Sequence, residues 1–306
     1  MTLLFARDKA LDPRVTFTRA SSGTYFDASG VMQTASTDVA RFTHDPVTGQ
    51  SLGLLIEESR TNLLLNSETL GTQSVTVSAT AYTLSFYGTG TITLSGVSSA
   101  GPLVGTGANN KVSLTFTPSA GSLTVTVSGS VKYANLEAGS FATSWIPTTG
   151  SSATRAADNA SITGANFSSW YNQAEGTIVI DYENGLAGYI VLAAGSDTSN
   201  AIRLGTRLAG SSDEVLVVID GGAGQVSLGN SPSTQRNICA ASYKENDFAL
   251  SMNGAAASTT SFGTVPTADT LAIGGTPFYV AFNGTIASIA YYPTRLSNSY
   301  LQYLTS

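Results

Sequence analysis

Few side chains in this sequence have the chemistry of a catalyst, and they are scattered along the chain. His44 is the only histidine, so a triad that needs an imidazole must use it. It lies in His44-Asp45-Pro46, which has the composition of a turn. Cys239 is the only cysteine and lies among apolar residues, with no electropositive setting to form a thiolate. We expect structural roles for both residues.

Two carboxylates are the remaining candidates for catalysis. Asp181 and Glu183 lie two residues apart in a predicted strand over residues 177–182, so both would point to one face. Glycoside hydrolysis needs such a pair, but Asn184-Gly185 ends the strand at once, and a solvated sheet face explains the pair equally well. Asp213-Glu214 and Asp220 have no spacing typical of a calcium site. We therefore expect no catalytic residue, no metal and no cofactor.

Aromatic side chains near predicted loops are candidates for sugar binding. Trp170 and Tyr171 precede a strand, and Phe278 and Tyr279 follow a Gly-Gly pair. Sugars stack their apolar faces on such rings. The alternative for each ring is ordinary packing between sheets. We expect Trp145 in the core.

Composition favours a β protein without nucleic-acid or membrane contacts. Of the 306 residues, 42% are hydrophobic and 11% are charged, which is the reverse of a disordered chain. The net charge is −6, and the 14 Lys and Arg form no basic cluster that could bind phosphates. No apolar run is long enough for a transmembrane helix, and the N-terminus does not read as a secretory signal.

The elements divide the chain into three regions of an all-β fold. Residues 1–60 carry much of the charge and many turn signals, and we expect an extended arm with short hairpins that needs a neighbour to bury against. Residues 61–148 alternate apolar residues with Ser and Thr, which predicts a short jelly-roll sandwich. After a linker, residues 155–306 predict a second sandwich with a turn at Asn253-Gly254 and a closing helix capped by Ser297.

Three segments resemble parts of phage fibre proteins. Residues 38–67 resemble the segment leading into the head spike fibre domains of tailed phages; their sequence is DVARFTHDPVTGQSLGLLIEESRTNLLLNS. Residues 135–148, NLEAGSFATSWIPT, are similar to the closing strand of a carbohydrate-binding-module-like jelly roll. The C-terminal third, with LSMNG at 250–254, LAIGG at 271–275 and FNGTIASIAYYP at 282–293, resembles a laminin-G-like or concanavalin-A-like sandwich.

The resemblance implies a virion structural protein without enzymatic activity, a head spike or tail fibre subunit. It implies that residues 1–60 attach to capsid or tail proteins, that the chain forms a homo-oligomer (a trimer by analogy with fibres), and that the C-terminal sandwich faces host surface polysaccharide. The protein would be made in the bacterial cytoplasm and reside in the virion. Asn62 and Tyr82 lie unusually close for such jelly rolls, so we expect the middle region to act as a spacer.

Two alternatives remain open. One is a polysaccharide depolymerase that uses Asp181 and Glu183, because phage fibres often degrade surface polysaccharide. The other is a capsid decoration protein without a receptor function.

Overall fold

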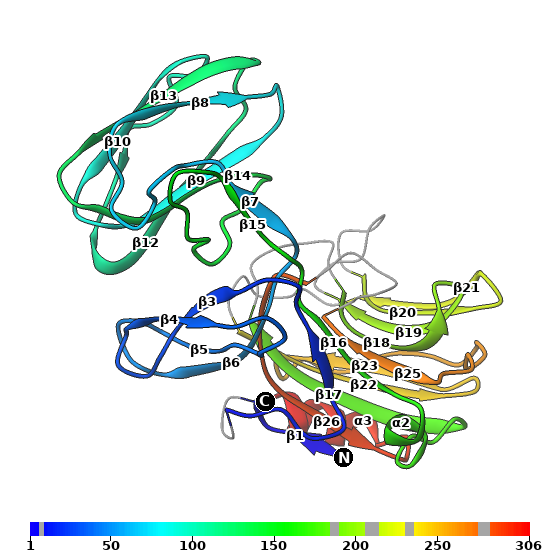
Figure 1. The fold of residues 1–306 in the computed structure, drawn as a ribbon. Coiled ribbons are helices and arrows are strands. Elements are labelled where there is room, and N and C mark those ends of the chain that lie inside the picture. The colour runs from blue at the N-terminus through cyan, green and yellow to red at the C-terminus, as the bar shows by residue number, and fades with distance from the viewer. Residues whose placement is uncertain (6–8, 184–189, 206–213, 230–235, 275–281) are drawn as a thin grey trace.

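The computed structural model describes residues 1–5, 9–183, 190–205, 214–229, 236–274 and 282–306. Strands dominate this part of the chain, which confirms the all-β prediction. The strands form two lobes, one built from the middle of the chain and one from both ends together (Figure 1). No helix in the described ranges is long and apolar enough to cross a membrane.

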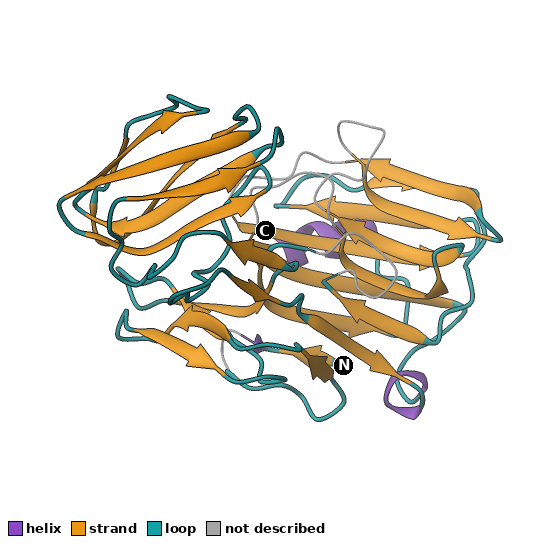
Figure 2. Ribbon diagram, turned by 45° about the horizontal axis from the view of Figure 1, so that its top comes forward, coloured by secondary structure: helices purple, strands orange, loops and turns teal. Residues whose placement is uncertain are grey.

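The larger lobe is a sandwich of two sheets. Sheet A contains β24 (Ser258–Thr260), β23 (Phe248–Met252), β22 (Arg236–Lys244), β17 (Glu175–Glu183), β26 (Gly284–Tyr292), β6 (Ser51–Ile56) and β5 (Phe42–His44) in that order, and β1 (Thr2–Leu3) also pairs with β26. Sheet B contains β2 (Thr16–Thr18), β16 (Asn159–Thr163), β25 (Thr270–Ile273), β18 (Ile190–Asp197), β19 (Asn200–Gly205), β20 (Glu214–Asp220) and β21 (Ala223–Gly229). Figure 2 shows the two sheets of this lobe beside the smaller lobe.

One hydrophobic core fills the space between sheets A and B. Ile178, Ile180 and Tyr182 alternate along β17 toward this core, as the period of a strand requires. Sheet B contributes Leu192, Ile202 and other apolar side chains to the same core. The opposite face of sheet A, called the outer face here, therefore carries Val179, Asp181 and Glu183 from β17.

Residues 1–60 are arranged differently from the extended arm that the sequence suggested. β1 and β6 add to sheet A at β26, and β2 adds to sheet B at β16. Leu54 and Ile56 are fully buried in the core of the C-terminal sandwich. The sequence predicted that this segment needs a neighbouring surface for its apolar side chains. The C-terminal sandwich of the same chain provides that surface, and burial there removes the side chains from water. The short hairpin of β3 (Gly23–Phe26) and β4 (Met32–Ala35) stands apart from the two large sheets.

The middle of the chain forms a smaller sandwich with a core of its own. One sheet contains β11 (Leu103–Val104), β10 (Thr91–Gly96), β13 (Gly121–Ser128) and β8 (Gln73–Val77), and the other contains β12 (Gly107–Phe116), β9 (Tyr82–Gly88) and β14 (Val131–Ala138). The predicted alternation is present, since Leu84 and Phe86 lie in this core. Thr83 and Ser85, on the other face of β9, are also buried. β9 is the central strand of its sheet. The turn at Gly139 and Ser140 lies over that face, where the Gly139 carbonyl oxygen accepts a hydrogen bond from the Thr83 hydroxyl.

A two-stranded ribbon joins the lobes. β7 (Arg60–Asn62) pairs with β15 (Ala153–Arg155), so the chain enters and leaves the smaller sandwich side by side. Asn62 fixes the entry point because its side-chain amide donates to the carbonyl oxygens of Ala134 and Ile146 at 2.9 Å each.

Two helices are described. The closing helix α3 (Asn298–Thr305) is confirmed, and the hydroxyl of Ser297 accepts a hydrogen bond from the backbone of Tyr300. α3 packs Leu301 against Ala240 and Ala249 on the outer face of sheet A. The one-turn helix α2 (Ala165–Ser168) was not predicted. The predicted turn at Asn253-Gly254 is confirmed, because both residues have positive φ, 49° and 76°.

Candidate functional site

A network of buried ion pairs lies where the two lobes meet. Arg19 Nη1 is 3.1 Å from Asp158 Oδ1, and Arg41 contacts both Asp158 and, at 2.8 Å, Glu57 Oε2. Arg155 Nη1 lies 3.0 Å from the same Glu57 oxygen. The three arginine side chains are almost entirely removed from solvent. Because an unpaired buried charge is costly, each member depends on the others remaining in place.

Glu57 also binds the smaller sandwich through hydrogen bonds. Its oxygens accept from the backbone N–H and the hydroxyl of Ser144, each at 2.6 Å. Burial by itself would raise the pKa of Glu57, but Arg155, Arg41 and the Ser144 hydrogen bonds outweigh it and lower the pKa to about 2. Glu57 is therefore an ionised structural group with all its partners inside the protein.

This network connects the two segments that carry the sequence resemblance. Arg41 and Glu57 belong to residues 38–67, and Ser144 belongs to residues 135–148. The charges of residues 1–60 that lie in the network face inward and hold the lobes together. They do not form an exposed docking surface.

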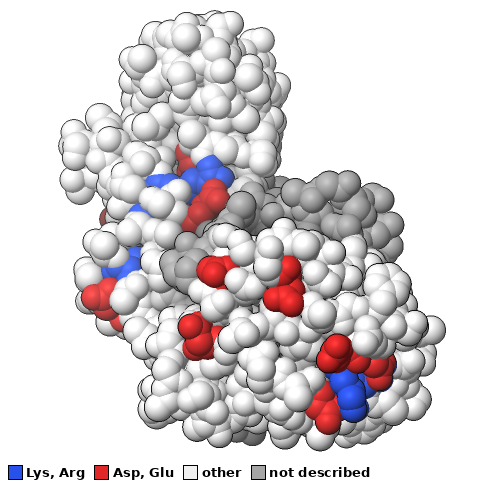
Figure 3. Space-filling model, turned by 90° about the vertical axis from the view of Figure 1, so that its right-hand side faces the viewer, with Lys and Arg blue, Asp and Glu red and all other residues white. Residues whose placement is uncertain are grey.

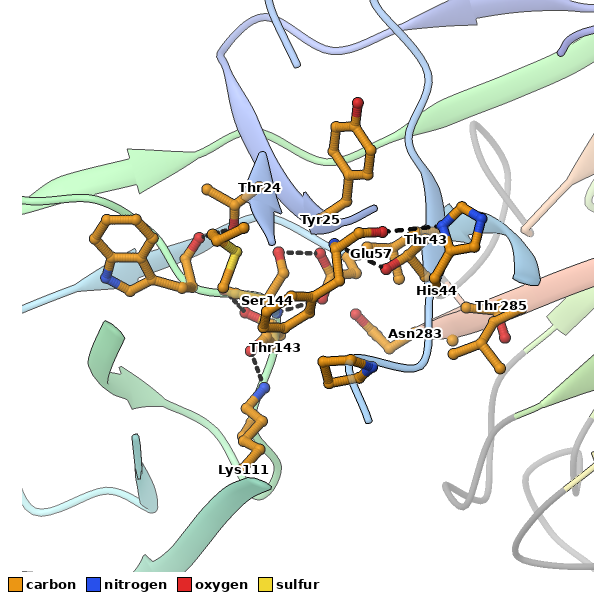
Figure 4. A pocket seen from close by; sticks show the side chains of 18 of the residues that line it. Thr24, Tyr25, Thr43, His44, Glu57, Lys111, Thr143, Ser144, Asn283 and Thr285 are labelled. Atoms are coloured by element: carbon orange, nitrogen blue, oxygen red, sulfur yellow. Dashed lines mark hydrogen bonds between the residues drawn. The ribbon is translucent and has the colours of Figure 1, made fainter. Parts of the chain in front are cut away.

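A hollow of about 480 Å³ opens beside the network, between the hairpin β3–β4, the smaller sandwich and the edge of sheet A (Figure 4). We call it the junction hollow. Its lining includes five aromatic residues, Tyr25, Phe26, Tyr87, Phe141 and Trp145, together with His44, Glu57, Lys111, Glu183, Asn283 and Thr285. All three sequence regions contribute to it. Its size and its mixed aromatic and polar lining are typical of small-molecule sites.

The aromatic wall of the junction hollow is fixed by ring packing. Phe26 contacts Tyr87 edge to face at 5.3 Å between ring centroids, and Tyr133 tilts against Trp145 at 4.8 Å. Burial raises the pKa of the Tyr87 hydroxyl above its ordinary range, with Glu57 adding to the shift. Tyr25 and Phe141 are only half-buried, and the guanidinium of Arg60 lies over the Phe141 ring, 4.5 Å from its centroid.

His44 offers a hydrogen-bond acceptor on the wall of this hollow. Its Nδ1 lies 3.1 Å from the carbonyl oxygen of Phe26. A carbonyl oxygen only accepts, so we assign the proton of the neutral ring to Nδ1 and the lone pair to Nε2. Nε2 is buried and has no hydrogen-bond partner among the described residues. A ligand hydroxyl could donate to it.

The polar rim of the hollow comes from the smaller sandwich. Lys111 is exposed along its length, but its Nζ donates to the carbonyl oxygen of Thr143 (Figure 4). The Thr143 hydroxyl donates to Glu137 at 2.6 Å. Burial raises the pKa of Glu137 from its ordinary value, and the hydrogen bonds from Thr143 oppose the shift only in part.

Of the aromatic residues proposed from sequence, Trp170 and Tyr171 do not line this hollow. Tyr171 stacks on Phe167 at 4.5 Å and on Tyr291 at 5.6 Å, and Trp170 meets Tyr291 edge to face. These contacts match the packing alternative. Phe278 and Tyr279 lie outside the described residues. Trp145 is buried, as expected, although it also lines the hollow.

The other chemical candidates have structural surroundings. Arg236 holds Asp181 through two parallel hydrogen bonds, one of them 2.8 Å long, whereas Glu183 is exposed. Cys239 is fully buried, which raises the pKa of its thiol to about 12. Asp220 accepts from Thr264, and Asp213 lies outside the described residues. Within the described ranges, no group of three or more His, Cys, Asp and Glu residues could hold a metal ion.

Sequence reasoning did not find the residues that line the junction hollow. Tyr25 and Phe141 stand in short segments with no strand pattern that points to a site, and they lie more than a hundred residues apart. The available signal was the resemblance itself, because residues 135–148 include Phe141 and Trp145.

Figure 3 shows that charged side chains are sparse on one face of the molecule and gather in a few places.

Comparisons with known proteins give distant structural likenesses. No family model and no curated protein matches the sequence. A CBM40 module of a Ruminococcus gnavus IT-sialidase bound to α2,3 sialyllactose is 19% identical, with a TM-score of 0.37 over 44% of this chain and 84% of that one. Domain 4 of AbnA, a GH43 arabinanase from Geobacillus stearothermophilus, in complex with arabinotriose, is 12% identical, with a TM-score of 0.39 over 55% and 84%.

A NanB sialidase from Streptococcus pneumoniae is 15% identical, with a TM-score of 0.35, and the likeness covers 48% of this chain and 26% of the sialidase. The assignment of an all-β sandwich protein rests on the sheets described above.

Proposed function

We propose that this chain is a non-catalytic structural subunit of a phage particle, a head spike or tail fibre protein, that binds host surface glycan in the junction hollow. The observation that carries the binding role is the hollow itself. It presents half-buried rings of Tyr25 and Phe141 beside polar groups, the combination that holds sugars.

Binding without bond cleavage fits the polar groups of the site. Glycoside hydrolysis requires one carboxyl group that gives a proton and a second that acts as base or nucleophile. Glu57 is held ionised by two arginines, and Asp181 is bound by Arg236. Glu57 and Asp181 therefore already serve as partners of cations, whereas Glu183, which also lines the hollow, is exposed. Incubation with host capsule should therefore release no oligosaccharide, and release that Asp181→Asn abolishes would favour a depolymerase.

The virion role rests on the sequence resemblance and on the way the lobes are joined. A particle component transmits force between its attachment and its ligand, and buried ion pairs together with a paired ribbon suit that task. The parts of residues 1–60 that remain accessible to a virion partner include the exposed Val31, Val39 and Val47. Immunogold labelling of intact particles, with assembly measured by light scattering, tests location and the expected homo-oligomer. An absence of label on the particles would contradict the virion role.

Glycan binding is tested with two ring variants and one matched control. Tyr25→Ala and Phe141→Ala should each weaken binding to a host surface glycan found by array screening, by about tenfold (~1.4 kcal/mol). The loss follows from the removal of a stacking surface. Tyr303→Ala removes an equally large ring that is 69% exposed on α3, away from the hollow, and should leave the affinity unchanged. Equal losses in all three variants would contradict the proposal.

A further inference from the structure

A second hollow of about 310 Å³ adjoins the first one. Leu52 and Glu183 line both, so the two hollows meet at these side chains. The second hollow continues along sheet A, where β6 and β1 leave a gap on the same edge of β26. β6 pairs with β26 at residues 284–286 and β1 pairs with it at residues 289 and 290, so Ala287 and Ser288 lie between them.

Both hollows use the outer face of sheet A. Asp181 and Glu183 point to this face from β17, and Leu55 and Glu57 do so at the end of β6. A ligand seated on the aromatic wall could therefore extend over Leu52 toward Asp181 without leaving the face.

The second hollow is polar at the positions that such a ligand would reach. Arg236 is 61% exposed in its side chain, and its pairing with Asp181 uses only two of its five N–H donors. The Ser51 hydroxyl, also in the lining, is buried and has no hydrogen-bond partner among the described residues. Together these groups offer donors and acceptors to adjacent hydroxyls.

The charges that line the two hollows favour an uncharged ligand. The carboxylates are Glu57, Asp181 and Glu183, whereas the cations are Lys111 and Arg236. Arg236 is already neutralised by Asp181, the Lys111 Nζ donates to the carbonyl oxygen of Thr143, and an acidic sugar would meet the exposed Glu183.

We propose that the two hollows form one groove for a linear, neutral oligosaccharide, with one sugar on the aromatic wall and the following sugars over Ser51 and the Asp181–Arg236 pair. This inference rests on the proposed glycan binding and adds the substrate class and a second set of contacts. It also gives the Asp181 carboxylate a binding role.

The experiment measures affinity against chain length by isothermal titration calorimetry. The probes are size-fractionated linear oligomers of glucose, mannose and galactose, from single sugars to hexasaccharides, and a matching series of uronic acid oligomers. For the neutral series that binds, affinity should rise by about tenfold from the single sugar to the trisaccharide (~1.4 kcal/mol) and then level off. Asp181→Asn combined with Arg236→Gln should abolish this rise and leave the affinity for the single sugar unchanged.

The chain offers a matched control. Glu175 and Lys244 also pair across β17 and β22, at 3.5 Å, but at the opposite end of these strands and outside both hollows. Glu175→Gln with Lys244→Gln should keep the full dependence on chain length. Circular dichroism melting of both double variants checks that each is folded.

The possible failures are distinguishable. Binding of single sugars that requires Tyr25 but does not strengthen with chain length overturns the groove and leaves the proposed function standing. Tighter binding of the uronic acid series overturns the neutral ligand class. No binding by any series removes the proposed glycan function and the groove together.

Discussion

At the scale of single residues, Glu57 is the side chain on which the junction depends most. It pairs with Arg41 and Arg155 and accepts two hydrogen bonds from Ser144. Truncating one partner of a buried ion pair leaves the other charge without compensation. Glu57→Gln should therefore lower the free energy of unfolding by about 3–5 kcal/mol, as measured by urea denaturation.

The neighbouring residue provides the control for this prediction. Glu58 pairs with Arg60 at 2.5 Å, with the carboxylate side chain 25% exposed. Partly exposed pairs contribute about 0–1 kcal/mol, so Glu58→Gln should have a small effect. Similar losses in both variants would show that burial of the Glu57 network does not determine its contribution.

The same residue predicts how stability depends on pH. The pKa of Glu57 is lowered from 4.5 to about 2 in the folded chain, so its contribution is complete above 4.5 and is lost as the pH falls toward 2. The raised pKa of Glu137 acts in the opposite direction, but only above the ordinary value of 4.5. Between pH 4.5 and pH 2, the slope of stability against pH therefore reflects the titration of Glu57 and of the other acids with lowered pKa elsewhere in the chain.

Those other acids, which include Asp12 and Asp45, are present in both the wild type and Glu57→Gln, so they contribute to the slope in both proteins. Urea midpoints across this window should show that Glu57→Gln reduces the slope of stability against pH by up to about 1.4 kcal/mol per pH unit. Parallel slopes for the two proteins would mean that Glu57 keeps an ordinary pKa when folded.

At the scale of elements, the closing helix illustrates a local signal that the sequence carries in full. The Ser297 hydroxyl accepts from the Tyr300 backbone at 3.3 Å, and Leu301 is buried against sheet A. Ser297→Ala should destabilise the protein by about 1 kcal/mol, because one N–H of the first turn loses its acceptor. Thermal melts should show Ser297→Asp close to wild type, since aspartate also caps a helix. A melt of Ser297→Ala that coincides with wild type would show that packing alone holds α3.

At the scale of the whole molecule, two separate cores are joined by a ribbon and an ion network. The core of the large sandwich and that of the smaller one are distinct clusters. We expect the wild-type protein to unfold in one calorimetric transition because Arg155 couples the lobes through Glu57, Ser144 and the carbonyl oxygen of Glu58. Arg155→Met should separate this into two transitions.

The matched control for Arg155 is a surface arginine. Arg14 pairs with Asp12 at 2.7 Å near the N-terminus, and the Arg14 side chain is 32% exposed. Arg14→Met makes the same chemical change without touching the junction and should leave one transition. Two transitions in the wild-type protein would show that the lobes unfold independently despite the network.

The sequence by itself determined the all-β class, the alternating strands, the Asn253-Gly254 turn and the closing helix. These features follow from side-chain periodicity and from backbone preferences that act within a few residues. Only the tertiary structure decided that residues 1–60 join the C-terminal sandwich, that Trp170 and Tyr171 pack among other rings, and that Tyr25 and Phe141 share a hollow. Such contacts join residues that are distant in the chain, and periodicity contains no information about which face of one element meets another.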